Sequence, residues 1–210
     1  MRCEMCDMRI LPKSFYNRNT LQVAQDLLGC FLVRRIPHPQ PLSHSSRRGR
    51  GERILRCKIV EVEAYNGSKD LASHASRGRT ERNSVMFGQP GIIYVYFTYG
   101  MHYMLNIVTE EKDYPAAILI RAVEPVSHSA HRTSHNINGP ARLTKALKID
   151  KSFNGLPIYT KKYGLWIESR NKNEKPRIVK AKRIGVDYAG KYKNKKWRFY
   201  IKGNKFVSKK

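Results

Sequence analysis

Acidic residues, cysteines and long apolar runs are all scarce in this chain of 210 residues. Aspartate and glutamate together number 16, against 41 lysines and arginines, and the formal net charge is +25 at pH 7. Such an excess of positive charge attracts polyanions, among which DNA and RNA are the usual partners of a basic protein. Charge alone does not separate a nucleic-acid partner from a protein that is merely basic, so both interpretations stay open at this point.

The absence of any apolar run of 18 residues predicts that no helix spans a membrane. Residues 1–13 contain acids and no apolar segment, so they do not resemble a secretory signal. We therefore expect an intracellular protein, either cytoplasmic (nucleoid-associated) or nuclear, with no membrane partner.

The 4 cysteines are too few for a disulfide framework in a chain of this length. Cys3 and Cys6 have the spacing of half a zinc site, but a zinc ion needs two further ligands at suitable spacing. Cys30 and Cys57 stand alone in the sequence and do not supply them. We therefore expect no metal and no other cofactor.

Short alternating segments separated by turn residues indicate strands along most of the chain. They predict strands at residues 30–36, 54–65, 94–99, 103–108, 116–123 and 197–201. A short helix is predicted after Asn19, with Asn19 and Gln22 as a capping box and Gly29 as its stop. A second helix is predicted to begin at Gly139-Pro140. Hairpins with few helices are typical of a single α+β domain built on an antiparallel sheet.

The segment from Tyr94 to Tyr103 reads YVYFTYGMHY and predicts an aromatic hairpin. Tyr94 and Phe97 are assigned to the core, whereas Tyr99 and Met101 lie at the tip, where side chains gain little by packing within the protein. Tyr96 and Asn106 share a face only if the hairpin loop has an odd number of residues.

Two carboxylates lie on one face of the strand predicted at residues 54–65. The period of two places Val60, Val62 and Ala64 on the core face and Glu61, Glu63 and Tyr65 on the other. From this strand alone, exposure of the acids to solvent is the favoured interpretation. On a protein this basic, however, an acid kept on a nucleic-acid-binding face is a candidate for chemistry, because carboxylates repel phosphate.

The pairing of Glu63 with Tyr65 suits hydrolysis of a glycosidic bond. Tyr65 can stack on a base while Glu63 deprotonates a water beside the attached sugar carbon. Burial would raise the pKa of Glu63, and a neighbouring arginine would lower it again. Arg121, a lone charge in an apolar strand, is the candidate neighbour, with a purely structural ion pair to Glu61 or Glu124 as the alternative.

These residues occur within a series of motifs that resembles the alkyladenine (3-methyladenine) DNA glycosylase family, of the vertebrate type and not the helix-hairpin-helix type. The resemblance covers residues 14–207, which leaves residues 1–13 as an N-terminal extension. Within this range, residues 37–53 are rich in proline, serine and arginine and have no apolar period, which predicts a flexible basic loop between two strands. The motifs are E-V-E-A-Y-N-G at 61–67, His74, R-N-x-x-M-F at 82–87, P-G-x-x-Y-V-Y-x-x-Y-G-M at 90–101, Asn106, L-I-R-A-x-E-P at 119–125, G-P-x-x-L-x-x-A-L at 139–147, R-I-G-V at 183–186 and R-F-Y at 198–200.

The resemblance implies a single domain with a curved, mainly antiparallel, open-barrel-like sheet, flanked by helices and carrying a protruding hairpin. It implies a monofunctional enzyme of base-excision repair that is a monomer and acts on damaged double-stranded DNA without a metal or cofactor. Glu63 corresponds to the carboxylate that activates the hydrolytic water. Arg121 corresponds to the arginine that helps to hold this water, and the backbone of Ile184 to a further contact.

The resemblance also implies the base-binding and DNA-intercalating residues. The walls that sandwich the flipped base correspond to Tyr65, His74 and Tyr96. Asn106 corresponds to a residue that crowds the amino group of normal guanine. Tyr99 corresponds to the side chain pushed into the duplex, and Met101 lies beside it.

Two alternatives remain from the sequence. A non-catalytic nucleic-acid-binding module would use the same basic surface and aromatic hairpin, but would give Glu63 and Arg121 no reason to converge. Separation of these side chains by more than about 10 Å, too far for one bridging water, would favour it. Hydrolysis of RNA or nucleotides is the second alternative.

Overall fold

One long strand, β2 (Arg53–Asn66), organises the fold and carries both candidate carboxylates. The computed structural model describes residues 9–36, 53–126, 137–171 and 173–209. One edge of β2 pairs along most of its length with β5 (Ala116–Pro125). The other edge pairs first with β1 (Phe31–Ile36), at residues 53–58, and then with β8 (Arg198–Ile201), at residues 61–63. The carboxylates therefore lie at the centre of a sheet and not at its edge.

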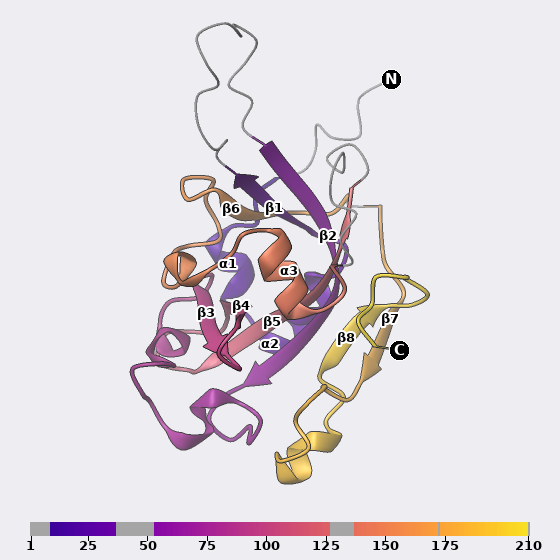
Figure 1. The fold of residues 1–210 in the computed structure, drawn as a ribbon. Helices are drawn as coiled ribbons and strands as arrows, with labels where there is room; N and C mark the ends of the chain where they lie inside the picture. The colour runs from indigo at the N-terminus through magenta and orange to yellow at the C-terminus, as the bar shows by residue number, and fades with distance from the viewer. Residues whose placement is uncertain (1–8, 37–52, 127–136, 172, 210) are drawn as a thin grey trace, which may run out of the picture.

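All the strand pairings are antiparallel, in the order β3-β4-β5-β2-β1-β6 with β8 and β7 beside the far end of β2. The sheet curls into an open half-barrel (Figure 1). The remaining strands are β3 (Ile93–Thr98), β4 (His102–Val108), β6 (Leu165–Glu168) and β7 (Ile178–Ala181). The predicted single α+β domain with a curved antiparallel sheet is confirmed.

Short helices cover this sheet. They are α1 (Lys13–Tyr16), α2 (Thr20–Asp26) and α3 (Pro140–Ala146), with 3₁₀ turns η2 (His74–Arg77), η3 (Ser84–Phe87), η5 (Lys151–Phe153) and η6 (Gly190–Asn194). In Figure 1, α3 lies in front of the strands, against β4 and β5, and α2 lies behind them, against β2 and β5. Buried aliphatic side chains from both helices and the sheet form one hydrophobic core, among them Val23, Leu27, Ile107, Ile118, Ile120 and Leu143.

The two predicted helices, α2 and α3, begin where the sequence signals place them. The Asn19 side chain accepts hydrogen bonds from the backbone N–H groups of Leu21 (3.1 Å) and Gln22 (3.4 Å), which caps α2. Gly29 then ends the segment with φ +85°, a conformation that favours glycine. Helix α3 begins at Pro140, as expected.

Two predicted boundaries fall partly outside the described residues. Of the loop predicted at 37–53, residues 37–52 lie outside them, and Arg53 is the first residue of β2. Of the extension predicted at 1–13, residues 1–8 lie outside them. Ile10 bridges to Glu168, and the N–H of Leu11 donates to the carbonyl of Ile167 at 3.0 Å.

The aromatic hairpin has a loop of odd length. Thr98 pairs with His102, which leaves Tyr99, Gly100 and Met101 as the loop. Tyr96 and Asn106 therefore share one face, as required for both to line a pocket.

The assignment of Phe97 to the core was wrong. This side chain is 48% exposed. Strand β4 pairs with β5 only at residues 106–108, so the outer half of the hairpin projects beyond the sheet. Phe97 consequently packs against Tyr103 (ring centroids 5.0 Å apart) and not against the core.

Candidate active site

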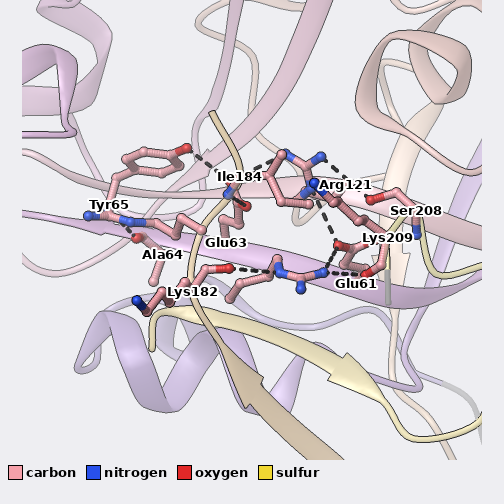
Figure 2. Close-up of polar contacts among 11 residues, drawn as sticks. Glu61, Glu63, Ala64, Tyr65, Arg121, Lys182, Ile184, Ser208 and Lys209 are labelled. Carbon is pink, nitrogen blue, oxygen red and sulfur yellow. Dashed lines mark hydrogen bonds and ion pairs between the residues drawn. The ribbon is translucent and has the colours of Figure 1, made fainter. Parts of the chain in front are cut away.

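Glu61 and Glu63 are both fully buried, with exposed fractions of 0%. Exposure of these acids to solvent, the interpretation favoured by the strand pattern alone, was wrong. Both faces of β2 are covered at this point, because the backbone of Ile184 and that of Ser208, near the C-terminus, contact the carboxylates on the face opposite the core (Figure 2). Buried carboxylates require charged or hydrogen-bonding partners, and here they have both.

Glu63 receives three contacts from three parts of the chain. Its Oε1 accepts the N–H of Ile184 at 2.8 Å, and its Oε2 accepts the hydroxyl of Tyr65 at 3.0 Å. The guanidinium of Arg121, on β5, lies 3.4 Å from Oε2. The predicted convergence of Glu63, Arg121 and the Ile184 backbone is therefore present in the fold.

The pKa of Glu63 lies above its ordinary value. Burial is the main cause, since it disfavours the charged form, and the negative charge of Glu61 adds to it. The charge of Arg121 and the hydrogen bonds from Ile184 and Tyr65 act in the opposite direction. A carboxylate whose pKa is raised toward neutrality accepts a proton more readily at physiological pH than an ordinary glutamate.

A cavity of about 330 Å³ opens next to Glu63. It is lined mainly by aromatic and aliphatic side chains and includes the predicted residues Tyr65, His74, Tyr96, Tyr99, Asn106, Arg121 and Ile184. Glu63 itself is not among the lining residues. It lies behind Tyr65, Arg121 and Ile184, each of which both lines the cavity and contacts the carboxylate. The volume is in the range of ligand pockets.

The aromatic walls are neutral. The rings of His74 and Tyr96 meet edge to face with centroids 4.5 Å apart, and His74 Nδ1 lies 3.0 Å from the hydroxyl of Tyr94. Burial, assisted by the charge of Arg82, lowers the pKa of His74, so its ring is uncharged at neutral pH. Burial raises the pKa of Tyr96 to about 12. Such rings offer π faces for stacking on a planar ligand.

The amide of Asn106 is fixed in the wall of the cavity. Its Nδ2 donates to the carbonyls of Tyr94 (3.1 Å) and Met104 (3.3 Å), and the residue is 3% exposed. A side chain held by two backbone groups does not swing away from an incoming ligand, so it sets a fixed boundary to what the cavity accepts.

The hairpin tip presents its side chains to solvent. Tyr99 is 84% exposed and Met101 is 69% exposed. Tyr99 adopts φ +52°, a left-handed conformation that is uncommon for a residue with a Cβ. Large apolar side chains exposed at a tip are typical of a binding surface.

The sequence did not reveal a further buried ion pair, whose arginine lies over the ring of Tyr65. Arg183 and Asp70 are joined at 2.5 and 2.7 Å, and both side chains are fully buried. Arg183 also donates to the carbonyl of Ala64 at 2.9 Å. No motif spacing links positions 113 residues apart.

Tyr94, which was predicted for the core, is 1% exposed. It also lines the cavity, where its hydroxyl contacts His74.

Within the residues that the structure describes, no group of three or more His, Cys, Asp or Glu side chains is placed to hold a metal ion. None of the described helices has the length and apolar character needed to cross a membrane.

Comparison with known proteins assigns the chain to a family. The profile described as methylpurine-DNA glycosylase (MPG) matches residues 14–205. A protein of Methanocella arvoryzae is 45% identical over 96% of this chain and 97% of its own length. Proteins of Legionella pneumophila (43%, covering 96% and 100%) and Clostridium perfringens (41%, covering 95% and 99%) are similarly related. All three carry the provisional name 3-methyladenine DNA glycosylase. The chain belongs to the methylpurine-DNA glycosylase family.

Proposed function

We propose that this protein removes alkylated purines, 3-methyladenine foremost, from double-stranded DNA by hydrolysis of the N-glycosidic bond. The observation that carries the proposal is the buried Glu63, held by Arg121, Tyr65 and the Ile184 backbone directly behind the wall of a cavity that is lined by aromatic side chains. The glycosylase unit spans residues 14–207. It acts as a monomer inside the cell, in the cytoplasm or nucleus, where its DNA substrate lies.

In this mechanism the damaged nucleotide leaves the base stack and enters the cavity. Flipping costs a few kcal/mol, least for a base that is damaged or poorly paired. Tyr65, His74 and Tyr96 stack on the flipped base, while Tyr99 and Met101 enter the duplex and fill the vacated space. A purine alkylated at N3 or N7 carries a positive charge, so the electron-rich tyrosine rings add a cation–π attraction.

Glu63 then acts as the general base. It takes a proton from a water as the water oxygen bonds to the sugar carbon, and the bond from that carbon to the purine nitrogen breaks. The bonding electrons neutralise the cationic purine, which leaves as the free base, and an abasic sugar remains. The alkylated purine is a good leaving group and needs no acid. Arg121 and the Ile184 backbone orient the carboxylate and the water.

The approach of Arg121 to within 3.4 Å of Glu63 supports catalysis over a non-catalytic binding module, for which this convergence has no use. The deciding experiment incubates the purified protein with methylated duplex DNA and measures free 3-methyladenine by chromatography. A panel of deaminated and etheno bases in the same duplex defines the range. Binding of the DNA without release of a base would establish the non-catalytic nucleic-acid-binding module. Preferential release of the base from methylated RNA of the same sequence would establish an enzyme that acts on RNA.

Base release should lose rate in acid. Glu63 must be ionised to accept a proton, and its pKa is raised by burial. The rate is therefore expected to rise with pH through a midpoint above that of an ordinary glutamate, and then to level off. Single-turnover release from methylated duplex DNA between pH 4.5 and 8 measures this rise, the acid limb of the pH–rate profile, and the plateau above it. A rate that stays flat across this range would contradict a role for Glu63 as base.

Replacing Tyr99 with alanine should weaken productive binding. Loss of an aromatic stacked in the duplex costs about 1–3 kcal/mol, equivalent to a roughly 5- to 150-fold fall in kcat/KM. Tyr114→Ala is the matched control, because Tyr114 is also an exposed tyrosine (41%) but lies away from the hairpin. Equal losses in both variants would speak against intercalation by Tyr99.

A further inference from the structure

Glu61 is a second carboxylate in the active-site region, and the proposed mechanism gives it no role. It lies two residues before Glu63 on β2 and is fully buried. Buried carboxylates are costly to maintain, so a fully buried glutamate beside a reaction centre calls for a physical reason.

The contacts of Glu61 are short and come from two other parts of the chain. Its Oε1 accepts from Arg198 Nη1 at 2.9 Å, and its Oε2 accepts the N–H of Ser208 at 2.7 Å. Arg198 is itself tied down, because it donates to the carbonyls of Lys182 (2.9 Å) and Lys209 (2.7 Å). Glu61 is therefore a negative charge that Arg198 and Ser208 hold in one position.

Arg121 in turn contacts both Glu61 and Ser208. Its Nε lies 3.5 Å from Glu61 Oε1, and its Nη2 lies 3.5 Å from the hydroxyl of Ser208 (Figure 2). Within the described residues, Nε has no hydrogen-bond acceptor, so its partner at this atom is the charge of Glu61. The remaining nitrogen, Nη1, is the one directed at Glu63.

The backbone brings the two groups together through an irregularity in the sheet. Glu61 lies opposite Ala122 and Val62 lies opposite Ile120, so the register between β2 and β5 shifts on both sides of Glu61 and passes over Arg121. Such irregularities redirect a side chain and are frequent beside active sites. Here the guanidinium of Arg121 lies on the face that carries both glutamates.

From this geometry we infer that Glu61 is a positioning residue that holds Arg121 against Glu63. Glu61 supplies the negative charge that lets two arginines lie buried beside the catalytic carboxylate. Without it, Arg121 loses its anchor at Nε and is no longer held beside Glu63. The inference rests on the proposed function, because it assigns a role in the same reaction.

The test is the pH–rate profile of Glu61→Gln in single-turnover release of 3-methyladenine. The groups that face Glu63 are Glu61 and Tyr65 on β2, Arg121 on β5, Tyr96 on β3, Arg198 on β8 and the N–H of Ile184. Of these, Glu61 is the negatively charged one, and its charge raises the pKa of Glu63. Its removal alone would lower that pKa, but the charge of Arg121 lowers it by more, so loss of Glu61 together with displacement of Arg121 is expected to raise the pKa of Glu63 and move the acid limb to higher pH. Misplacement of Arg121 should lower the plateau about 10- to 100-fold.

Glu61→Asp separates charge from position. It keeps the negative charge but shortens the reach, so Arg121 should be held less closely to Glu63 and the plateau should fall. Glu124→Gln is the control, since it removes a carboxylate on β5 that contacts Asn204, outside this cluster, and should change neither limb nor plateau. A variant that only loses stability keeps the wild-type limb.

An acid limb in Glu61→Gln that is unmoved or that moves to lower pH overturns the inference, because Arg121 has then stayed in place, and so does a wild-type plateau in Glu61→Asp. If Glu61→Gln does not fold, as judged by circular dichroism, the plateau of Glu61→Asp decides alone. Absence of base release by the wild-type protein overturns the proposed function and this inference together. Wild-type release with an unmoved limb in Glu61→Gln overturns this inference alone.

Discussion

Glu63→Gln is expected to lower the rate of base release by about 10²- to 10⁴-fold, the usual contribution of a general base. Glutamine has the same shape, so it can still accept the N–H of Ile184, which lies 2.8 Å from Oε1 in the wild type. It cannot take a proton from water. Arg121 keeps a partner in Glu61, so the cluster retains a negative charge and the fold should persist. Single-turnover release from methylated duplex DNA measures the effect.

The control for this variant must change the net charge equally, because a lost acid strengthens DNA binding by itself. Glu124→Gln removes one negative charge from the neighbouring strand, where the carboxylate contacts Asn204 at 2.9 Å. It should keep the wild-type rate. DNA affinity at fixed salt should be equal in the two variants. Full release by Glu63→Gln would refute the assignment of Glu63 as base. Equal losses of rate in Glu63→Gln and Glu124→Gln would show that the loss comes from the change in net charge.

The sequence predicted six of the eight described strands, because their signals are local, but β6 and β7 were not predicted. Alternation, glycine and proline sufficed for β2, the hairpin and the start of α3. Exposure was harder to predict, because it depends on segments distant in the chain. Glu61 and Glu63 are buried by residues 184 and 208, which no pattern within β2 can indicate. Phe97 is exposed because β5 ends its pairing before the hairpin tip, which also cannot be read within the hairpin.

The candidate site was also predictable only where the signal lies within one short segment of the sequence. The pairing of Glu63 with Tyr65 could be predicted from the period of a strand, and Arg121 from its isolation among apolar neighbours. The roles assigned to His74, Asn106 and Ile184 came from the family resemblance and not from local pattern. The buried pair of Arg183 and Asp70 escaped both, since each residue taken alone resembles an ordinary surface charge in a basic loop.

That pair gives the largest expected effect on stability. Asp70→Ala leaves the guanidinium of Arg183 buried without its carboxylate, which typically costs about 3–5 kcal/mol. For a chain of this size the melting temperature should fall by about 6–20 °C. Thermal unfolding followed by circular dichroism measures the change. Asp26→Ala is the matched control, because Asp26 pairs with Arg18 at 3.0 Å on the surface, with 42% of the side chain exposed. The control should stay within about 1 kcal/mol of the wild type.

A double variant identifies the source of the loss. Replacing Asp70 and Arg183 together by leucine removes both buried charges, and a buried pair replaced by apolar residues often loses little. Asp70, however, also accepts the N–H groups of Asn66 (3.2 Å) and Ala72 (3.1 Å), which leucine leaves without their acceptor. The double variant should therefore regain part of the stability lost in Asp70→Ala, and not all of it. No recovery would place the whole cost in the turn at residues 66–72, whereas complete recovery would place it in the unpaired charge of Arg183.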